Sequence, residues 1–354
     1  MFTSRPTSIG IFKIASAYIG TVVGAGFASG QEILRFFGAY GLIGLAGILI
    51  ASALFFFIGY SILMLGKSLR AHSHVDIVRH TNGKLPGTVI DMIITLFMFG
   101  GLCTMIAGSG AIFHEQYALP PFWGTAAMAA AALVTVMTGT QGVLNANSYI
   151  VPFLMISVLL IAAVSLSQSP VTAGDIRMTV GVDGATPHWL LSAVNYASYN
   201  IVVSIGVLAP IGAAATDRRQ LFWGALLGAA GLGVGMTAIF LCLLANMDAA
   251  ANAQIPMLII ARRILPAIKV LFPVVLLSAV YTTAVGNLYG FVRRMPQRLP
   301  RLAAVAGAAA IALAVGQLGF SNMVKYLYPV VGYGGMLFFV GVIHTWIAKR
   351  DSLR

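Results

Sequence analysis

Ten long apolar stretches run through this chain of 354 residues, and no polar stretch between them is long enough for a separate soluble domain. A helix of about 20 apolar residues spans the hydrocarbon core of a bilayer. Because 59% of the residues are hydrophobic and only 8% are charged, an ordinary soluble domain is excluded. We therefore predict an all-α polytopic protein of the cell (plasma) membrane, with a single integral membrane domain over residues 1–354.

The ten predicted transmembrane helices cover residues 10–37, 41–65, 88–113, 121–139, 147–167, 188–214, 220–246, 267–291, 302–319 and 323–347. With the N-terminus inside, fifteen of the 21 Lys and Arg residues fall on the inner side and six on the outer side. Connections rich in Lys and Arg stay in the cytoplasm, so we predict that both termini are cytoplasmic. These cations account for the net charge of +12, which therefore does not indicate a nucleic-acid partner.

The first predicted span is interrupted by Gly24-Ala25-Gly26-Phe27-Ala28-Ser29-Gly30-Gln31-Glu32. Three glycines within seven residues, followed by Gln31 and Glu32, favour unwinding of the helix near the middle of the membrane. Unwound backbone at that depth is tolerated only where it contacts protein or lines a cavity. Broken helices of this kind form the binding sites of many secondary transporters.

The ten spans divide into two sets of five, over residues 10–167 and 188–347. Because five is odd, the second set enters the membrane from the opposite side, which predicts an inverted repeat. In the sixth span, polar residues cluster between Leu191 and Asn200, and Gly206 and Pro210 follow. We therefore expect helices 1 and 6 both to be broken. A shorter apolar segment, Ile255 to Leu265, is predicted to form a helix over the outer mouth.

The segment from Gly24 to Ile33 resembles the opening motif of the YkvI-like membrane proteins, which are regarded as amino-acid permeases. The stretch Tyr196-Ala197-Ser198-Tyr199-Asn200 resembles their sixth helix. The resemblance covers essentially the whole chain. A more distant resemblance links it to the amino acid–polyamine–organocation superfamily and its LeuT-like fold of five plus five helices. The resemblance implies an ion-coupled permease.

Candidate substrate-binding residues lie in the first broken helix. Unwinding would expose backbone amides of Gly24, Ala25 and Gly26 at a helix N-terminus, where a substrate carboxylate could bind, with Ser29 nearby. The alternative is that the Gly-x-x-x-Gly pairs in this segment only permit close helix packing. Glu32 would pair with a substrate amine or carry a coupling proton.

Glu32 also has a structural alternative, since Arg35 follows three residues later on the same helical face and could pair with it at the outer surface. In the sixth span, Ser198, Tyr199 and Asn200 could contact the substrate through hydroxyl and amide groups. Their alternative role is in hydrogen bonds between helices.

The resemblance to LeuT-like transporters also implies a sodium site between the first and eighth spans. Its ligands would be the carbonyls of Gly20, Val23 and Ser278 and the hydroxyls of Thr282 and Thr283. A Thr-Thr pair in a membrane helix can instead bond its own preceding carbonyls. No other cofactor is expected.

We predict a secondary active transporter of an amino acid or a similar small zwitterion, working by alternating access in the lipid bilayer. A ligand-sensing receptor on the same scaffold and a channel are the alternatives. An enzyme is not expected, since no paired acids or His-Glu-x-x-His motif occur within the spans. The sequence leaves open the substrate, the choice between sodium and proton, the direction of transport and the oligomeric state.

Overall fold

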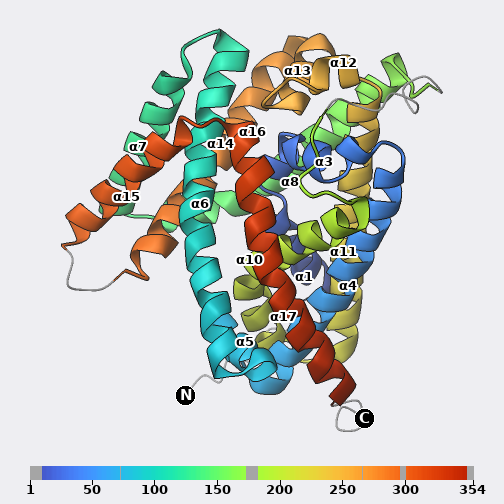
Figure 1. Ribbon diagram of the computed structural model, residues 1–354, viewed down its shortest axis with the longest axis vertical. Helices are drawn as coiled ribbons and strands as arrows, with labels where there is room; N and C mark the ends of the chain where they lie inside the picture. The colour runs from blue at the N-terminus through green and yellow to red at the C-terminus, as the bar shows by residue number, and fades with distance from the viewer. Residues whose placement is uncertain (1–9, 72, 173–181, 265, 296–299, 349–354) are drawn as a thin grey trace.

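The computed structural model describes residues 10–71, 73–172, 182–264, 266–295 and 300–348, apart from the side chains of 141–148. These residues form helices and short connections, with no β-strand among them (Figure 1). In chain order the helices are α1 (Ile11–Val22), α2 (Ala25–Ala28), α3 (Gln31–Phe36), η1 (Gly38–Tyr40), α4 (Ile43–Leu69), α5 (His74–Asn82), α6 (Lys84–Tyr117), α7 (Pro121–Thr138), α8 (Gln141–Gln168), α10 (Trp189–Ala214), α11 (Arg218–Leu244), α12 (Met247–Ala250), α13 (Pro256–Ile264), α14 (Pro266–Val292), α15 (Arg301–Gly316), α16 (Phe320–Asn322), η2 (Met323–Leu327) and α17 (Tyr328–Ala348).

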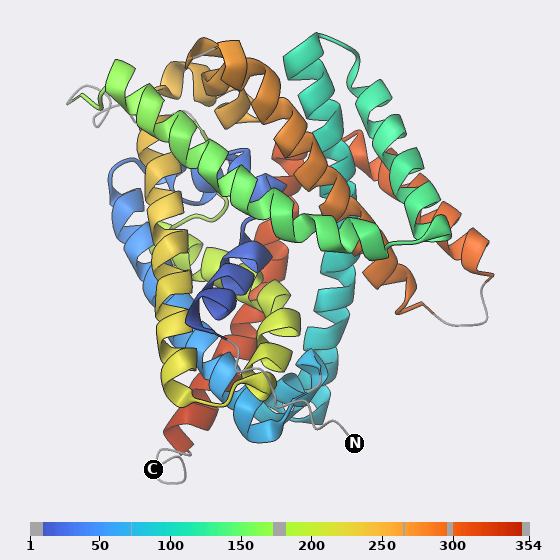
Figure 2. The ribbon, with the colours of Figure 1, turned by 180° about the vertical axis from the view of Figure 1, so that it is seen from behind.

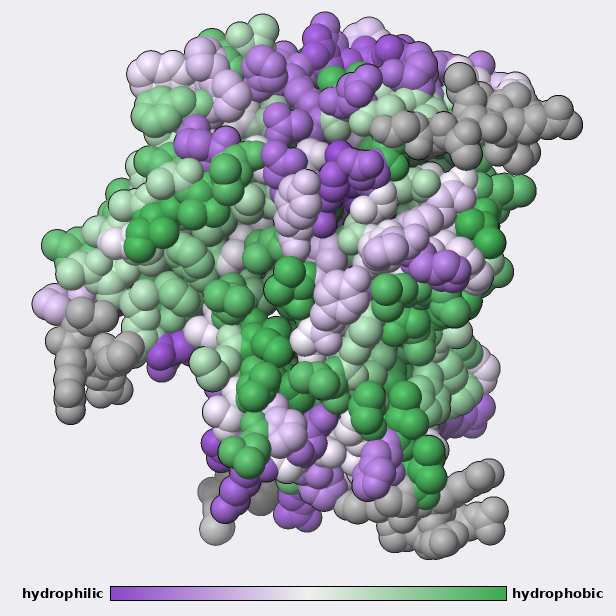
Figure 3. Space-filling view, in the orientation of Figure 1, coloured by the Kyte–Doolittle hydropathy of each residue, from purple (hydrophilic) through white to green (hydrophobic). Residues whose placement is uncertain are grey.

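Eight of the described helical segments are long and apolar enough to cross a membrane, and α1 and α15 are shorter apolar helices of 12 and 16 residues. On the face shown in Figure 3, apolar residues predominate across the middle of the molecule, while polar residues gather toward its two ends. Because lipid chains offer no hydrogen-bonding partner, such a band is the expected lipid-facing surface. The predicted all-helical membrane architecture is confirmed, with eight spans by length and composition.

Two groups of helices pack within the molecule. The first joins α1, α4, α10 and α11, and the second joins α6, α7, α14 and α15. Helix α17 packs against both α10 and α6, and α8 crosses the back of the molecule, where it contacts α11 and α14 (Figure 2). Helices α12 and α13 lie at one end of the molecule, and α5 and the end of α17 lie at the other (Figure 1). We call these the α13 end and the α5 end.

The first predicted span is divided into three short helices. Helix α1 stops at Val22, where the Val23 amide donates to Ile19 O at 2.8 Å and the Gly24 amide turns back to Val22 O at 3.0 Å. Gly24 is extended, with φ −114° and ψ −171°, and α2 begins directly after it. A second interruption lies at Gly30, whose φ of 79° is in the left-handed region that favours glycine.

Helix α13 covers this second interruption. It forms the short helix that the sequence predicted, and the Met257 amide donates to the Ser29 carbonyl at 2.9 Å. The Met257 side chain lies against Gly30, where an added Cβ would come within 2.8 Å of it. A carbonyl released by the break therefore finds its partner in another helix, as unwound backbone inside a membrane protein must. Leu265, which ended the predicted segment, lies outside the described residues.

The break predicted in the sixth span is not present, since α10 runs without interruption from Trp189 to Ala214. Its polar side chains have other uses. Ser192 Oγ donates to Phe36 O at 2.7 Å, and Asn195 Nδ2 donates to Pro329 O at 2.9 Å. Because these groups find partners on neighbouring helices, they need no unwinding of their own helix.

Paired glycines bring α10 close to α4. A Cβ added at Gly212 would overlap the carbonyl oxygen of Leu63, and one added at Gly66 would overlap that of Ala209. Small residues at such positions allow the two backbones to touch, which is a main source of helix association in membranes.

We therefore expect Gly212→Ala to destabilise the protein by about 1–3 kcal/mol, because an overpacked contact must open. Gly206→Ala is the matched control on the same helix, since no atom lies within 4 Å of its added Cβ. Alanine is the better helix former by about 1 kcal/mol, so the control should be neutral or stabilising. Thermal unfolding of the detergent-solubilised protein measures both, and equal stability of the two variants would contradict this contact.

Candidate functional site

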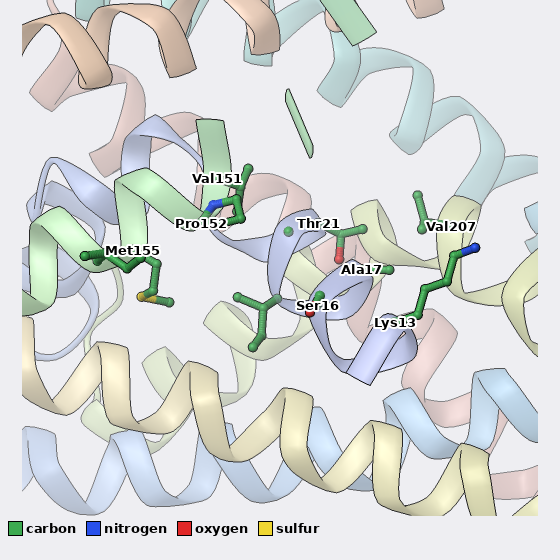
Figure 4. Close-up of a pocket in the computed structure, with 11 residues that line it drawn as sticks. Lys13, Ser16, Ala17, Thr21, Val151, Pro152, Met155 and Val207 are labelled. Carbon is green, nitrogen blue, oxygen red and sulfur yellow. The ribbon is translucent and has the colours of Figure 1, made fainter. Parts of the chain in front are cut away.

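A cavity of about 680 Å³ lies between α1, α8 and α10. Its size is in the range of small-molecule sites in proteins, and its walls are mostly apolar. Figure 4 shows its lining side chains, which come from these three helices. The residues that line it are Lys13, Ser16, Ala17, Ile19, Gly20, Thr21, Val151, Pro152, Met155, Ile156 and Val207. Because Lys13 and Ser16 are exposed, the cavity is open to the outside of the molecule.

The cavity reaches the break that follows α1. Gly20 and Thr21, in the last turn of α1, form part of its wall. Thr21 Oγ1 hydrogen-bonds to Ser204 Oγ on α10 at 2.8 Å, which fixes the end of α1 against that helix. No atom lies within 4 Å of a Cβ added at Gly24, so space remains open beside the break. The first amides of α2 therefore lie near an accessible volume, and helix N-termini favour anionic groups.

Glu32 is a buried carboxylate on α3, with only 5% of its surface exposed. The Tyr199 hydroxyl on α10 donates to Glu32 Oε2 in a short hydrogen bond. On the opposite side, Glu32 Oε1 lies so close to Gly26 that a Cβ added there would overlap it. The alternative role predicted for Glu32 is wrong, because its carboxylate forms no ion pair with Arg35.

Aromatic rings from four helices pack together beside this carboxylate, and we call them the aromatic cluster. Its members are Phe36 on α3, Phe97 on α6, Tyr196 and Tyr199 on α10, and Tyr328 on α17. Ring centroids of Tyr199 lie 5.4 Å from Tyr196 and 5.0 Å from Tyr328. The Tyr196 hydroxyl is buried and makes no hydrogen bond, which is unusual for a tyrosine inside a protein.

Five polar residues join α3, α16, η2 and the connection before α10 toward the α13 end. We call Gln31, Arg35, Asp183, Ser321 and Lys325 the polar lock. The Gln31 amide group and Ser321 Oγ are hydrogen-bonded at 2.6 Å, and Arg35 Nη2 donates to Ser321 Oγ at 2.7 Å. Lys325 Nζ forms an ion pair with Asp183 Oδ2 at 2.6 Å. The lock ties α3, the part of the broken helix nearer the α13 end, to the segment before α17.

The connection before α10 packs across α3 and is hydrogen-bonded to it. Arg35 Nη1 donates to Asp183 O at 3.0 Å, and the Ala185 amide donates to Arg35 O at 2.9 Å. The Tyr40 hydroxyl donates to Thr186 O. The hydrogen bond and charge of Lys325 hold the pKa of Asp183 below its ordinary value, so this ion pair persists into mildly acidic solution.

Sequence reasoning considered Arg35 as a possible partner of Glu32, and it did not find Asp183 or Ser321 as its partners. The two partners are 148 and 286 residues away from Arg35 along the chain. No local pattern connects them, because only the folded helices bring them together.

The side chains of the remaining predicted substrate-binding residues form hydrogen bonds with backbone groups in this conformation. Ser29 Oγ donates to Gly26 O at 2.7 Å and accepts from the Gln31 amide at 3.2 Å. Ser198 Oγ donates to Gly332 O on α17 at 2.8 Å, and Asn200 Nδ2 donates to Tyr196 O at 3.0 Å. Contact between these side chains and a substrate stays a prediction.

The residues of the predicted sodium site lie on α1, at the break and on α14. Ser278 Oγ donates to Val274 O at 2.8 Å and Thr282 Oγ1 to Ala279 O at 3.1 Å, as hydroxyl groups in membrane helices commonly do. These bonds use the hydroxyl protons of both side chains. Gly20 and Val23 lie on either side of the end of α1, Thr283 adjoins Thr282, and the predicted ligand set remains a prediction.

Several solved structures of membrane transporters have a similar fold. They include MhsT in complex with L-phenylalanine (TM-score 0.59, 18% identity, covering 97% of this chain and 90% of that one). A sodium-coupled sialic acid symporter has a TM-score of 0.60 and 12% identity, covering 95% of this chain and 79% of that one. Mhp1 in its inward-facing conformation has a TM-score of 0.58 and 14% identity, covering 97% of this chain and 78% of that one. At these identities the likeness shows the fold, and the chain therefore has the LeuT-like fold that the sequence predicted.

Two proteins of Bacillus subtilis (strain 168) are similar along most of their length. The uncharacterized membrane protein YkvI is 28% identical over 346 residues, which cover 96% of this chain and 97% of that protein. The uncharacterized protein YyaD is 25% identical over 318 residues, which cover 89% and 90%. No protein-family model matches the chain.

The contact between Gly26 and Glu32 predicts that Gly26→Ala lowers the free energy of unfolding by about 1–3 kcal/mol, because the carboxylate must leave its place beside Tyr199. Gly24→Ala is the matched control, since its φ suits alanine and its surroundings are open. Thermal unfolding without ligand compares them. If Gly26→Ala is as stable as the control, the tight contact does not exist in the protein.

The cavity and the lock also predict one-sided access. Ser16→Cys, at an exposed cavity position, should react with a membrane-impermeant thiol reagent added at the α5 end, whereas Ser29→Cys, at a residue 1% exposed under α13, should resist it from both sides. The native Cys103 and Cys242 are buried, so the background is low. Right-side-out and inverted vesicles separate the two sides. Reaction of Ser29→Cys from the α13 end would contradict a closed lock.

Proposed function

We propose that this chain is a secondary active transporter of an amino acid or a similar small zwitterion, working by alternating access in the cell membrane. The observation that carries the proposal is the asymmetry around the broken first span. The break adjoins a cavity that is open to the outside of the molecule, and we propose that this opening gives access from the α5 end, while the polar lock joins the segments toward the α13 end. A site that is open on one side and closed on the other is what alternating access requires.

The contact pattern supports a division into moving parts. Helices α1, α4, α10 and α11 pack as one bundle, and α6, α7, α14 and α15 as another group. We propose that α1 to α3 together, and α15, are two further spans, which gives ten with both termini cytoplasmic. Residues 10–167 and 188–347 then form the two inverted repeats, and the first bundle rocks against the remaining helices.

We propose that the substrate binds beside the break, between α1, α6, α10 and α14. Its carboxylate would accept hydrogen bonds from the amides of Gly24, Ala25 and Gly26, with Tyr199 close by. MhsT, which was solved with L-phenylalanine, supports this class of substrate through its similar fold. A sodium ion held by Gly20, Val23, Ser278, Thr282 and Thr283 is one candidate for the coupling ion.

The test of this proposal is ligand binding followed by uptake. Purified protein should be stabilised by an amino acid from a panel of the twenty proteinogenic ones, because a ligand that binds only the folded state raises its stability, by about 2.7 kcal/mol at a hundredfold excess over Kd. Running the thermal-shift panel with and without sodium reports whether that ion contributes. The stabilising amino acid, radiolabelled, should then accumulate in proteoliposomes.

The outcomes separate the proposal from its alternatives. Accumulation against a concentration gradient supports a secondary transporter. Binding without accumulation in vesicles would indicate a ligand-sensing receptor instead. Flux that never exceeds equilibration would indicate a channel, and the absence of both binding and uptake for the whole panel would refute the proposed substrate class.

A further inference from the structure

We propose that Glu32, together with Tyr199 and Tyr196, is a proton-binding site, and that its proton is the ion coupled to transport. This inference deepens the proposed function and rests on it. It is carried by the geometry around a single carboxyl group: a buried acid without a cation, one hydroxyl donor already in contact, and a second hydroxyl without any partner.

Burial without a cation makes the ionised form of Glu32 costly. An ionised carboxylate removed from water loses several kcal/mol unless a cation or several hydrogen bonds replace the water. Glu32 is 5% exposed and receives one hydrogen bond, from Tyr199. A bound proton removes the charge, and it requires no space in a site where Gly26 already lies against the carboxyl group.

The charged side chains on α3 and on the elements around it either bind other groups or lie away from Glu32. On α3 itself, Arg35 binds Ser321 and Asp183. On η2, Lys325 pairs with Asp183. Neither α2 nor α10 contains a charged residue, and the two arginines of α11 lie in its first turn, at the opposite end of that helix from its contact with α3. Among the described residues, the titratable groups that face Glu32 are Tyr196, Tyr199 and Tyr328.

The two tyrosines of α10 suit two protonation states of Glu32, the neutral acid and the ionised carboxylate. Tyr199 already donates to Glu32, and the Tyr196 hydroxyl lies near Glu32, Tyr199 and Asn200 without reaching hydrogen-bond geometry with any of them. A carboxylate can accept several hydrogen bonds, whereas a protonated carboxyl accepts fewer and donates one. The unpartnered Tyr196 hydroxyl therefore fits the protonated state, and it would supply a second donor when the proton leaves.

Contact with Gly26 links this proton to the substrate. Because Glu32 Oε1 lies against α2, an anionic group bound at the break would be close to the carboxyl group. Two neighbouring negative charges repel each other, so protonation of Glu32 would strengthen binding of a substrate carboxylate. By linkage, bound substrate would in turn raise the affinity of Glu32 for its proton. Such mutual strengthening is the thermodynamic requirement for carrying both in the same direction.

The first experiment detects the proton without any substrate. Infrared difference spectra of the purified protein between acidic and basic pH should contain a carboxylic-acid C=O band that is absent from Glu32→Gln. Glu115→Gln is the matched control, because Glu115 is a partly buried acid that accepts hydrogen bonds from the amides of Gln254 and Ile255. Its substitution should leave the Glu32 band in place. Tyr199→Phe, which keeps the acid but removes one donor to its ionised form, should move the midpoint of the band to higher pH.

The second experiment measures coupling in proteoliposomes with a mixture of radiolabelled amino acids. An inward proton gradient without sodium should drive accumulation by the wild type and by Glu115→Gln. Glu32→Gln should lose this accumulation while keeping exchange of internal for external amino acid, because the neutral side chain mimics the protonated state. Retained exchange also shows that this variant is folded.

The outcomes distinguish the two proposals. If the band is absent, or if Glu32→Gln still accumulates amino acids on a proton gradient, the proton site is refuted while wild-type accumulation still supports transport. If the wild type accumulates only on a sodium gradient, coupling by Glu32 is refuted and the sodium site is supported. If no gradient drives uptake, the transport proposal fails, and loss of the band in Glu32→Gln would still support a proton on this residue.

Discussion

The structure depends on how interrupted backbone is satisfied inside an apolar environment. A membrane helix that stops at Val22 and turns again at Gly30 releases peptide groups that lipid cannot bind. The protein supplies partners from its own chain: Met257 donates to the Ser29 carbonyl, and Ser29 Oγ donates to Gly26 O. The only other solution is an accessible cavity, and one is present where α1 ends. The break therefore fixes where a small solute can meet polar backbone.

The same broken span contributes to both ends of the site. Helix α1 forms a wall of the cavity, whereas α3 supplies Gln31 and Arg35 to the polar lock. Glu32 lies between them, in contact with α2 on one side and with Tyr199 of α10 on the other. A displacement of α1 to α3 relative to α6 and α17 would therefore change the cavity, the lock and the surroundings of the carboxyl group together. This arrangement gives a physical reason for placing substrate and coupling ion at one segment.

Much of the architecture could be predicted from the sequence because hydrophobic length is a local property. The span expected at 188–214 is observed as Trp189–Ala214, and the one expected at 121–139 as Pro121–Thr138. The break near Gly24 could also be predicted, since glycines in a row of small residues lower the cost of unwinding. The same reasoning wrongly predicted a break in α10. A serine or asparagine that faces another helix has the same local sequence pattern as one beside a break.

The sequence by itself determined the membrane environment, the all-helical class, the short helix α13 and the position of the first interruption, because each depends on residues that are neighbours in the chain. The tertiary structure alone decided which polar groups meet. Glu32 lies 167 residues from Tyr199 in the sequence, and Arg35 lies 286 residues from Ser321. Hydrogen bonds and ion pairs act over a few ångströms, so their partners are set by helix packing and not by the order of residues.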